Sequence, residues 1–221
     1  MRLSHTFGGT LMSGDSENVY MKEIPIENID LDIAFRLAWH ILTNIEHSYL
    51  GKYSDEHSLN RHAIFVLIDG DKKIIMSLET GEDKLILKLK GENEQRIKDI
   101  EDNIAQQIAE SIEDYKTYDE DKSNRIRMAI IGEIALDKLI SDVIKNENLT
   151  NLQYNLAHAR EMMIKSVTTF HPITLEISGW LTKLREYLNS EIPEQYLKDL
   201  MVKSKQWKKE ASKIIDELKT A

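Results

Sequence analysis

Apolar residues in the first half of the chain recur at helical spacing in two places. From about 31 to 50 they alternate between intervals of four and three, which predicts a helix that begins after the capping residue Asp30. A second stripe with helical spacing runs through about 92–116. Each predicted helix has one apolar face, so both are expected to lie on a sheet.

Strand patterns lie before and between these two helices. Residues 63–68 form an unbroken apolar run of strand length, whereas 72–79 and 84–90 alternate apolar and polar positions. Residues 3–12 and 17–26 also have extended patterns, and the polar residues between them predict a hairpin turn. The first half of the chain is therefore predicted to hold five strands.

The resulting element order is ββαβββα, which predicts an α+β domain over residues 1–118 with a mostly antiparallel five-stranded sheet and two helices. A polar stretch at 117–122 marks the predicted end of this domain. The element order resembles that of longin and profilin-type folds. This resemblance implies an interaction platform, and it assigns no residues.

Helical spacing continues through residues 119–221, which are predicted to form a second domain, an antiparallel helical bundle. Short polar connections separate four helical stretches, at about 124–145, 151–170, 175–189 and 193–219. The first of them includes a bulky apolar run at 126–131 that is also compatible with a strand.

The last predicted helix carries apolar residues at strictly alternating intervals of three and four, which is a heptad seam. The seam forms either one wall of the bundle or a surface that binds a protein partner or a second copy of the chain. In the second case the partner-binding residues are Leu197, Leu200, Trp207, Ile214 and Leu218.

The same helix contains a basic stretch from Lys203 to Lys209 with an aromatic residue inside it. Between residues 198 and 213 there are six lysines against two acidic residues. An anionic membrane, a nucleic acid or an acidic protein surface could bind such a patch. A bundle helix with a solvated lysine face has the same pattern, so the stretch alone assigns no partner.

Charge is distributed unevenly between the two halves. The 221 residues include 38 acidic and 29 basic side chains, for a formal net charge of −9. Residues 1–118 hold 22 acidic against 13 basic residues, while 119–221 hold 16 of each. Nucleic-acid binding depends on Lys and Arg that displace counterions, so the acidic first half argues against a broad nucleic-acid-binding face.

The chain has no cysteine, which excludes disulfides, thiolate metal ligands and cysteine nucleophiles. It starts without an apolar run of signal-peptide length, and no apolar stretch has the length of a membrane span. Together these features predict a cytoplasmic protein.

Acidic residues at two predicted strand turns form the first candidate site. Carboxylates at these turns, with a lysine, could hold Mg²⁺ or another divalent metal and orient a water molecule for phosphodiester cleavage. The helix, three strands and helix of residues 31–116 resemble the core of restriction-endonuclease-like nucleases. The sequence departs from the pattern of that family, because no proline precedes the candidate aspartate. The resemblance implies a catalytic role for Asp69, Asp71, Glu82 and Lys84. Ordinary solvated hairpin turns are the alternative.

Histidines form the second candidate site, a metal site that could also use Glu46. Two of the histidines lie seven residues apart on one face of the predicted helix, and two follow in the next loop, so imidazoles from both segments could meet around a metal. The candidate ligands are His40, His47, His57 and His62. A solvated polar helix face is the alternative, since no compact zinc-binding motif is present.

No other motif indicates catalysis. Gly8 and Gly9 lack the second glycine group and the lysine of a nucleotide-binding loop, and the sequence contains no nucleophile elbow. The leading hypothesis is therefore a non-catalytic protein-interaction module with a regulatory or adaptor role and no cofactor, and the metal-dependent nuclease is the alternative. A third hypothesis is a small-molecule sensor with a pocket between the sheet and the first helix, lined by Phe35, Trp39 and Phe65.

Overall fold

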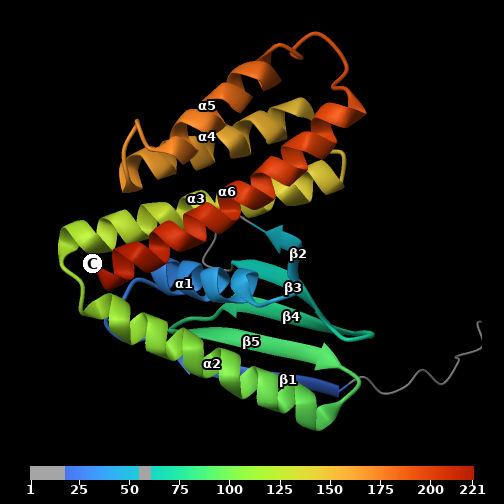
Figure 1. Cartoon of the computed structure of the whole chain (residues 1–221). Coiled ribbons are helices and arrows are strands. Elements are labelled where there is room, and N and C mark those ends of the chain that lie inside the picture. Colours follow the sequence, from blue (N-terminus) through green and yellow to red (C-terminus); the bar gives the residue numbers. More distant parts are fainter. Residues whose placement is uncertain (1–17, 55–60) are drawn as a thin grey trace, which may run out of the picture.

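The computed structural model describes residues 18–54 and 61–221, which form a five-stranded antiparallel sheet followed by a layered set of helices (Figure 1). The strands lie in the order β1-β5-β4-β3-β2 across the sheet. Their bounds are Asn18–Pro25 (β1), Ser48–Ser54 (β2), His62–Asp69 (β3), Lys72–Thr80 (β4) and Lys84–Gly91 (β5). The predicted α+β class, with the sheet first and the helices after it, is confirmed.

One face of the sheet is covered by the helices α1 (Leu31–Asn44) and α2 (Glu94–Lys116). Alternate residues of the central strands point toward these helices, and Phe65, Met76 and Leu89 form one fully buried row across three strands. Fully burying a side chain of this kind contributes about 1.5–3 kcal/mol relative to leaving it in water. This layer is therefore the main core of the first half of the chain.

Both helices begin at a capping side chain that the sequence supplies. A carboxylate oxygen of Asp30 accepts a hydrogen bond from the backbone N–H of Asp32 at 2.7 Å, and the side-chain oxygen of Asn93 accepts one from the backbone N–H of Arg96 at 3.0 Å. Such caps satisfy amides that have no partner inside the helix. The predicted starts of both helices agree with the structure to within two residues.

The predicted end of the first helix, at residue 50, is wrong, because α1 ends at Asn44 and β2 begins at Ser48. His47 has a left-handed φ of 62° at the reversal between them, a conformation that a continuous helix cannot contain. Tyr49 then pairs with Val66 of β3, so sheet pairing overrides the helical spacing. The predicted strand at 3–12 lies outside the described residues, and β1 corresponds to the strand predicted at 17–26.

Four further helices follow, each within four residues of its predicted bounds: α3 (Glu120–Ile144), α4 (Leu149–Ser166), α5 (Pro172–Arg185) and α6 (Glu194–Thr220). Residues 126–131 lie inside α3, so the strand alternative for them is wrong. In Figure 1, α3 and α6 lie over α1, and α4 and α5 form the outermost layer. α1 is therefore enclosed between the sheet and two helices of the second half.

The predicted domain boundary coincides with the short connection between α2 and α3. Buried apolar residues from both sides of this connection belong to one continuous core, and α1 packs against α3 across it. The division into domains of 1–118 and 119–221 therefore stays a prediction.

Candidate functional site

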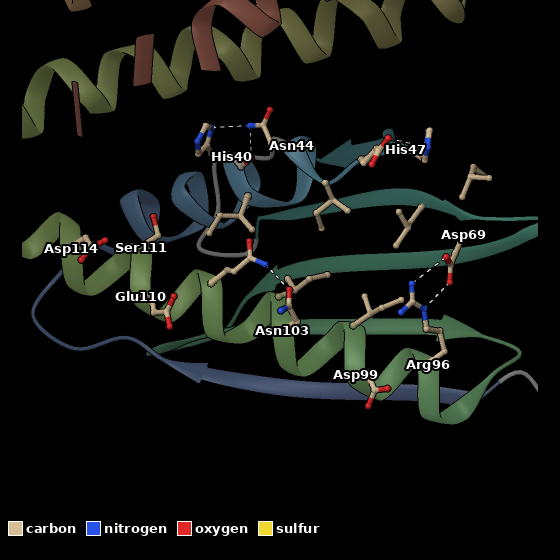
Figure 2. Close-up of a pocket in the computed structure, with 18 of the residues that line it drawn as sticks. His40, Asn44, His47, Asp69, Arg96, Asp99, Asn103, Glu110, Ser111 and Asp114 are labelled. Atoms are coloured by element: carbon tan, nitrogen blue, oxygen red, sulfur yellow. Dashed lines mark hydrogen bonds and ion pairs between the residues drawn. The ribbon is translucent and has the colours of Figure 1, made fainter. Parts of the chain in front are cut away.

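A groove of about 840 Å³ runs between α1 and α2, above the last residues of β3 (Figure 2). α1 forms one wall and α2 the other, and Lys219 near the end of α6 also lines it. This volume lies in the range of ligand-binding sites, roughly 300–1,000 Å³. We refer to it as the α1–α2 groove.

The floor of the α1–α2 groove is apolar. Its apolar residues come from α1 and its C-cap, from α2 and from β3, and they are Ile41, Ile45, Ile100, Ile104, Leu67 and Ile68. Residues three or four apart share one face of a helix, so the spacing that predicts these helices also brings these side chains together. Several of them, such as Ile41 and Ile100, are only half-buried, so the floor is accessible to a ligand.

The rim along α2 is acidic. Asp99, Glu110 and Asp114 line the groove and are exposed to solvent. None of the three forms an ion pair with another residue in the described part of the chain. Their spacing puts them on one stripe of α2, so their charges add to one negative field that attracts cationic ligands.

An ion pair closes one end of the groove. Arg96 at the start of α2 donates from Nε to Asp69 Oδ2 at 2.9 Å and from Nη2 to Asp69 Oδ1 at 3.3 Å, as the dashed lines in Figure 2 show. The hydrogen bond from Arg96 holds the pKa of Asp69 below its ordinary value. The pair is exposed, so it contributes little stability and mainly fixes the start of α2 against the end of β3.

The wall formed by α2 also offers hydrogen-bonding groups. Ser111 Oγ is shielded from solvent and has no hydrogen-bond partner among the described residues. Asn103 Oδ1 accepts from Gln107 Nε2 at 2.5 Å, which orders these two amides along the groove. An apolar floor, an acidic rim and the free hydroxyl of Ser111 suit a ligand that is both apolar and cationic.

A buried polar network lies behind the groove, where α1 meets α3 and α6. Glu133 of α3 is fully buried, and its Oε2 accepts from His40 Nδ1 at 2.5 Å. Its Oε1 accepts from Asn44 Nδ2 at 3.1 Å and from the hydroxyl of Ser212 on α6. Both carboxylate oxygens of Glu133 are therefore satisfied without water.

The network continues one helical turn along α3 at Asp137, which is 4% exposed. Asp137 accepts from Trp39 Nε1 at 3.1 Å, from the hydroxyl of Thr43, and from Lys208 Nζ at 2.7 Å. Lys208 Nζ also donates to the backbone oxygen of Thr43 at 3.2 Å. Three helices thus contribute to one cluster of matched donors and acceptors.

The ionised form of Glu133 is the favoured one despite its burial. Desolvation raises the pKa of a buried carboxyl, but the charge of His40 and three hydrogen bonds outweigh it and hold the pKa of Glu133 below its ordinary value. A buried carboxylate with this many partners stabilises one arrangement of its neighbours, because any other arrangement leaves the charge unpaired.

The candidate nuclease residues are not brought together. Asp69 and Asp71 lie at the β3–β4 turn and Glu82 and Lys84 at the β4–β5 turn, and these turns are at opposite ends of the nine-residue strand β4. At about 3.3 Å per residue the two pairs are roughly 25 Å apart. The structure therefore does not bring these four side chains together at one site, and their catalytic role stays a prediction. Instead, Asp69 pairs with Arg96, and Lys84 with Glu23 at 2.8 Å.

The candidate metal ligands are also dispersed. His40 is buried against Glu133, His47 is exposed beside Glu46, and His62 Nε2 lies 2.9 Å from Ser77 Oγ on β4. His57 lies outside the described residues. Within the ranges 18–54 and 61–221, no group of three or more potential ligands is placed to hold a metal ion.

The predicted partner-binding seam faces the interior of the molecule. Leu200, Trp207 and Ile214 are buried, and Leu197 and Leu218 are partly buried against the same core. Trp207 Nε1 donates to Glu176 of α5 at 2.9 Å. The seam thus forms a wall of the bundle in this structure, and partner binding through it stays a prediction.

The aromatic residues of the predicted sensor pocket form core contacts. The ring centroids of Trp39 and Phe65 are 5.5 Å apart in an edge contact, and those of Trp39 and Phe35 are 6.0 Å apart. All three side chains are buried, and none of them lines the α1–α2 groove.

Several residues of the site were not predicted from the sequence. Glu133 and Asp137 interrupt an otherwise apolar stretch of α3. Two acidic residues four positions apart within such a stretch are the sequence feature that indicates a buried polar contact. Arg96, Asp99 and Asp114 resemble any other charged residue of an amphipathic helix, so their place on a groove is visible only in three dimensions.

Comparisons with known proteins add no relationship. No protein-family model matches the chain, and no similar curated protein or solved structure was found. None of the helices among the described residues combines the length and apolarity that crossing a membrane requires. Function is therefore inferred from the α1–α2 groove and its chemistry.

Proposed function

We propose that this chain is a non-catalytic protein-interaction module, with a regulatory or adaptor role in the cytoplasm, whose α1–α2 groove binds a basic amphipathic segment of a partner protein. The observation that carries the proposal is a row of carboxylates above an apolar floor, Asp99, Glu110 and Asp114, that form no ion pair among the described residues. Asp99 and Glu110 accept hydrogen bonds from the neutral amides of Gln95 and Gln106, which leaves their charges uncompensated. This combination matches a segment with apolar residues on one face and lysine or arginine beside them.

The physical basis is the recognition of amphipathic helices in grooves. Such a segment anchors apolar side chains at helical spacing, and charges along the rim select its orientation and speed its association. Here the apolar floor supplies the anchoring surface and the acidic stripe of α2 supplies the charges. Arg96 and Asp69 limit the groove at one end, so a bound segment would enter from the end near Asp114.

The groove supports this proposal better than the seam of α6 does. Seam residues such as Trp207 are buried inside the chain, so binding a partner through them would require the bundle to open. The α1–α2 groove is accessible in the structure as it stands. The acidic balance of residues 1–118 favours the same class of partner.

The test is binding of a fluorescent helical peptide built from leucine and lysine, with a peptide in which glutamate replaces lysine as a specificity control. Glu110→Lys reverses one rim charge and is expected to weaken binding about five- to tenfold, in line with roughly 1 kcal/mol per charge contact. Glu113→Lys changes the same residue type three positions away, outside the groove, and should leave the affinity within about twofold.

Fluorescence anisotropy at two salt concentrations gives the affinities. Weaker binding at high salt, confined to the lysine peptide and sensitive to Glu110→Lys, supports the proposal. Equal effects of Glu110→Lys and Glu113→Lys, or equal binding of the two peptides, would exclude the groove as the binding site.

A further inference from the structure

A second cavity of about 390 Å³ lies on the other side of α1, between β2, α3 and α6. Its volume also lies in the range of small-molecule sites, roughly 300–1,000 Å³. Asn44 at the end of α1 lines both this cavity and the α1–α2 groove, so the two are separated by the end of one helix. We call it the β2–α6 cavity.

The walls of the β2–α6 cavity are mainly apolar. Leu50 comes from β2, Ile140 and Ile144 come from α3, and the ring of Tyr49 completes the surface. Ile144 is 64% exposed and Tyr49 is 55% exposed, which places two large apolar side chains in contact with water at the same opening. Covering such surface with the apolar part of a ligand is favourable because it removes apolar area from water.

Lysines of α6 line the same cavity. Lys208 is already used inside the protein, by Asp137 and Thr43. Lys205 and Lys209 are exposed, and within the described part of the chain neither forms an ion pair or a hydrogen bond. The cavity therefore combines an apolar interior with two unpaired positive charges.

An unsatisfied hydroxyl inside the cavity points independently to a ligand. Ser48 at the start of β2 lines the cavity and is only 8% exposed. Its Oγ has no hydrogen-bond partner among the described residues. A buried polar atom without a partner is unfavourable, so a ligand oxygen that accepts from this hydroxyl would remove a penalty in the free protein.

We propose that the β2–α6 cavity binds a small single-chain amphiphile with an acidic head group. Its apolar chain lies against Leu50, Ile140 and Ile144, and its head group is held by Lys205 and Lys209. This site is distinct from the α1–α2 groove, and the charge of its ligand is opposite to that of the partner segment. The basic stretch of α6 thus gains a specific role that a merely solvated lysine face lacks.

Decanoate and decyl phosphate are suitable probes below their micellar concentrations, and 1-decanol serves as an uncharged control with the same chain. Isothermal titration calorimetry is expected to show saturable binding of at least one acid, at least tenfold tighter than that of 1-decanol. The amide signals that shift in a heteronuclear NMR titration should belong to the cavity lining, with Ser48 and Ile144 among them.

A matched pair of variants separates this site from unspecific attraction to lysine. Lys205→Ala with Lys209→Ala is expected to weaken binding of the acid at least tenfold, while leaving 1-decanol binding unchanged. Lys198→Ala with Lys213→Ala removes the same charge from the same helix outside the cavity and should change binding less than twofold. All four side chains are on the surface, so the variants should keep the wild-type melting temperature.

The proposal is overturned if neither acid binds the wild-type protein saturably, if 1-decanol binds as tightly as the acids, or if both pairs of variants weaken binding equally. Failure of the peptide to bind in the α1–α2 groove leaves these outcomes unaffected, because the two tests use different ligands and different variants.

Discussion

The two sides of α1 are packed in different ways. Toward the sheet, Trp39 packs its ring on Phe35 and Phe65 in apolar edge contacts. Toward α3 and α6, α1 presents polar groups such as His40 that pair with buried carboxylates. Apolar contact is non-directional, whereas each buried hydrogen bond has a defined distance and angle. The sheet side therefore supplies most of the stability, and the polar side determines where the C-terminal helices sit on α1.

The largest effect is expected on the sheet side. Phe65→Ala removes a fully buried ring and should lower the free energy of unfolding by about 3–5 kcal/mol. Urea denaturation followed by circular dichroism measures this loss. Val19→Ala, at a residue of the same sheet that is 62% exposed, should cost less than about 0.5 kcal/mol. Similar losses for both variants would contradict the apolar account of this side.

A smaller effect is expected on the polar side. Glu133→Gln keeps the shape of the side chain but removes its charge and turns one acceptor into a donor, which should cost about 1–3 kcal/mol in the same denaturation experiment. Glu110→Gln makes the same chemical change on the exposed rim of the groove and should cost less than about 0.5 kcal/mol. If the two glutamates respond alike, the buried network does not hold the helices.

The third expected effect is a change in the pH dependence of stability, which cannot exceed the loss that Glu133→Gln causes at neutral pH. The pKa of Glu133 is lower in the folded protein than its ordinary value of 4.5, so the unfolded chain binds the proton more tightly. The stability that Glu133 contributes is therefore fully present above about pH 4.5 and is lost as the pH falls through the folded pKa.

Urea denaturation between pH 3 and 7 measures the free energy of unfolding of wild type and Glu133→Gln. The difference between the two proteins is expected to be about 1–3 kcal/mol at neutral pH and to become smaller in acid. Exposed carboxylates with lowered pKa values, such as Asp69 and Asp102, are present in both proteins and cancel in the comparison. A difference that stays constant over the whole range would show that Glu133 acts through its hydrogen-bond acceptors and not through its charge.

The two sides of α1 also differ in how far the sequence predicts them. The sheet side follows from local patterns, because an apolar residue at every second or every third and fourth position is enough to identify a strand or a helix. The polar side does not, because the helix pattern marks His40 and Asn44 as a solvated face. Only the packing of α3 and α6 on α1, which involves residues more than 80 positions away, shows that these groups are buried.

The acidic candidate residues lie apart for a related reason. The sequence places both Asp69 and Glu82 at strand turns, yet successive turns of an antiparallel meander lie at opposite ends of the shared strand. That separation follows from the topology once each strand is known. β2 was missed because Tyr49 continues the helical spacing of the preceding residues, and its pairing with Val66 depends on a strand that comes later in the chain.

The position of α6 has a consequence for biosynthesis. Lys208 and Ser212 of α6 are hydrogen-bonding partners of Asp137 and Glu133. They also contact Thr43 and Asn44 of α1, which precede them by 165 and 168 residues. A ribosome adds residues from the N-terminus onward, so α6 emerges after α1 and α3. Until then the two carboxylates of α3 lack part of their hydrogen bonding. The nascent chain can therefore form its sheet early, but it reaches this helix arrangement only after α6 has emerged.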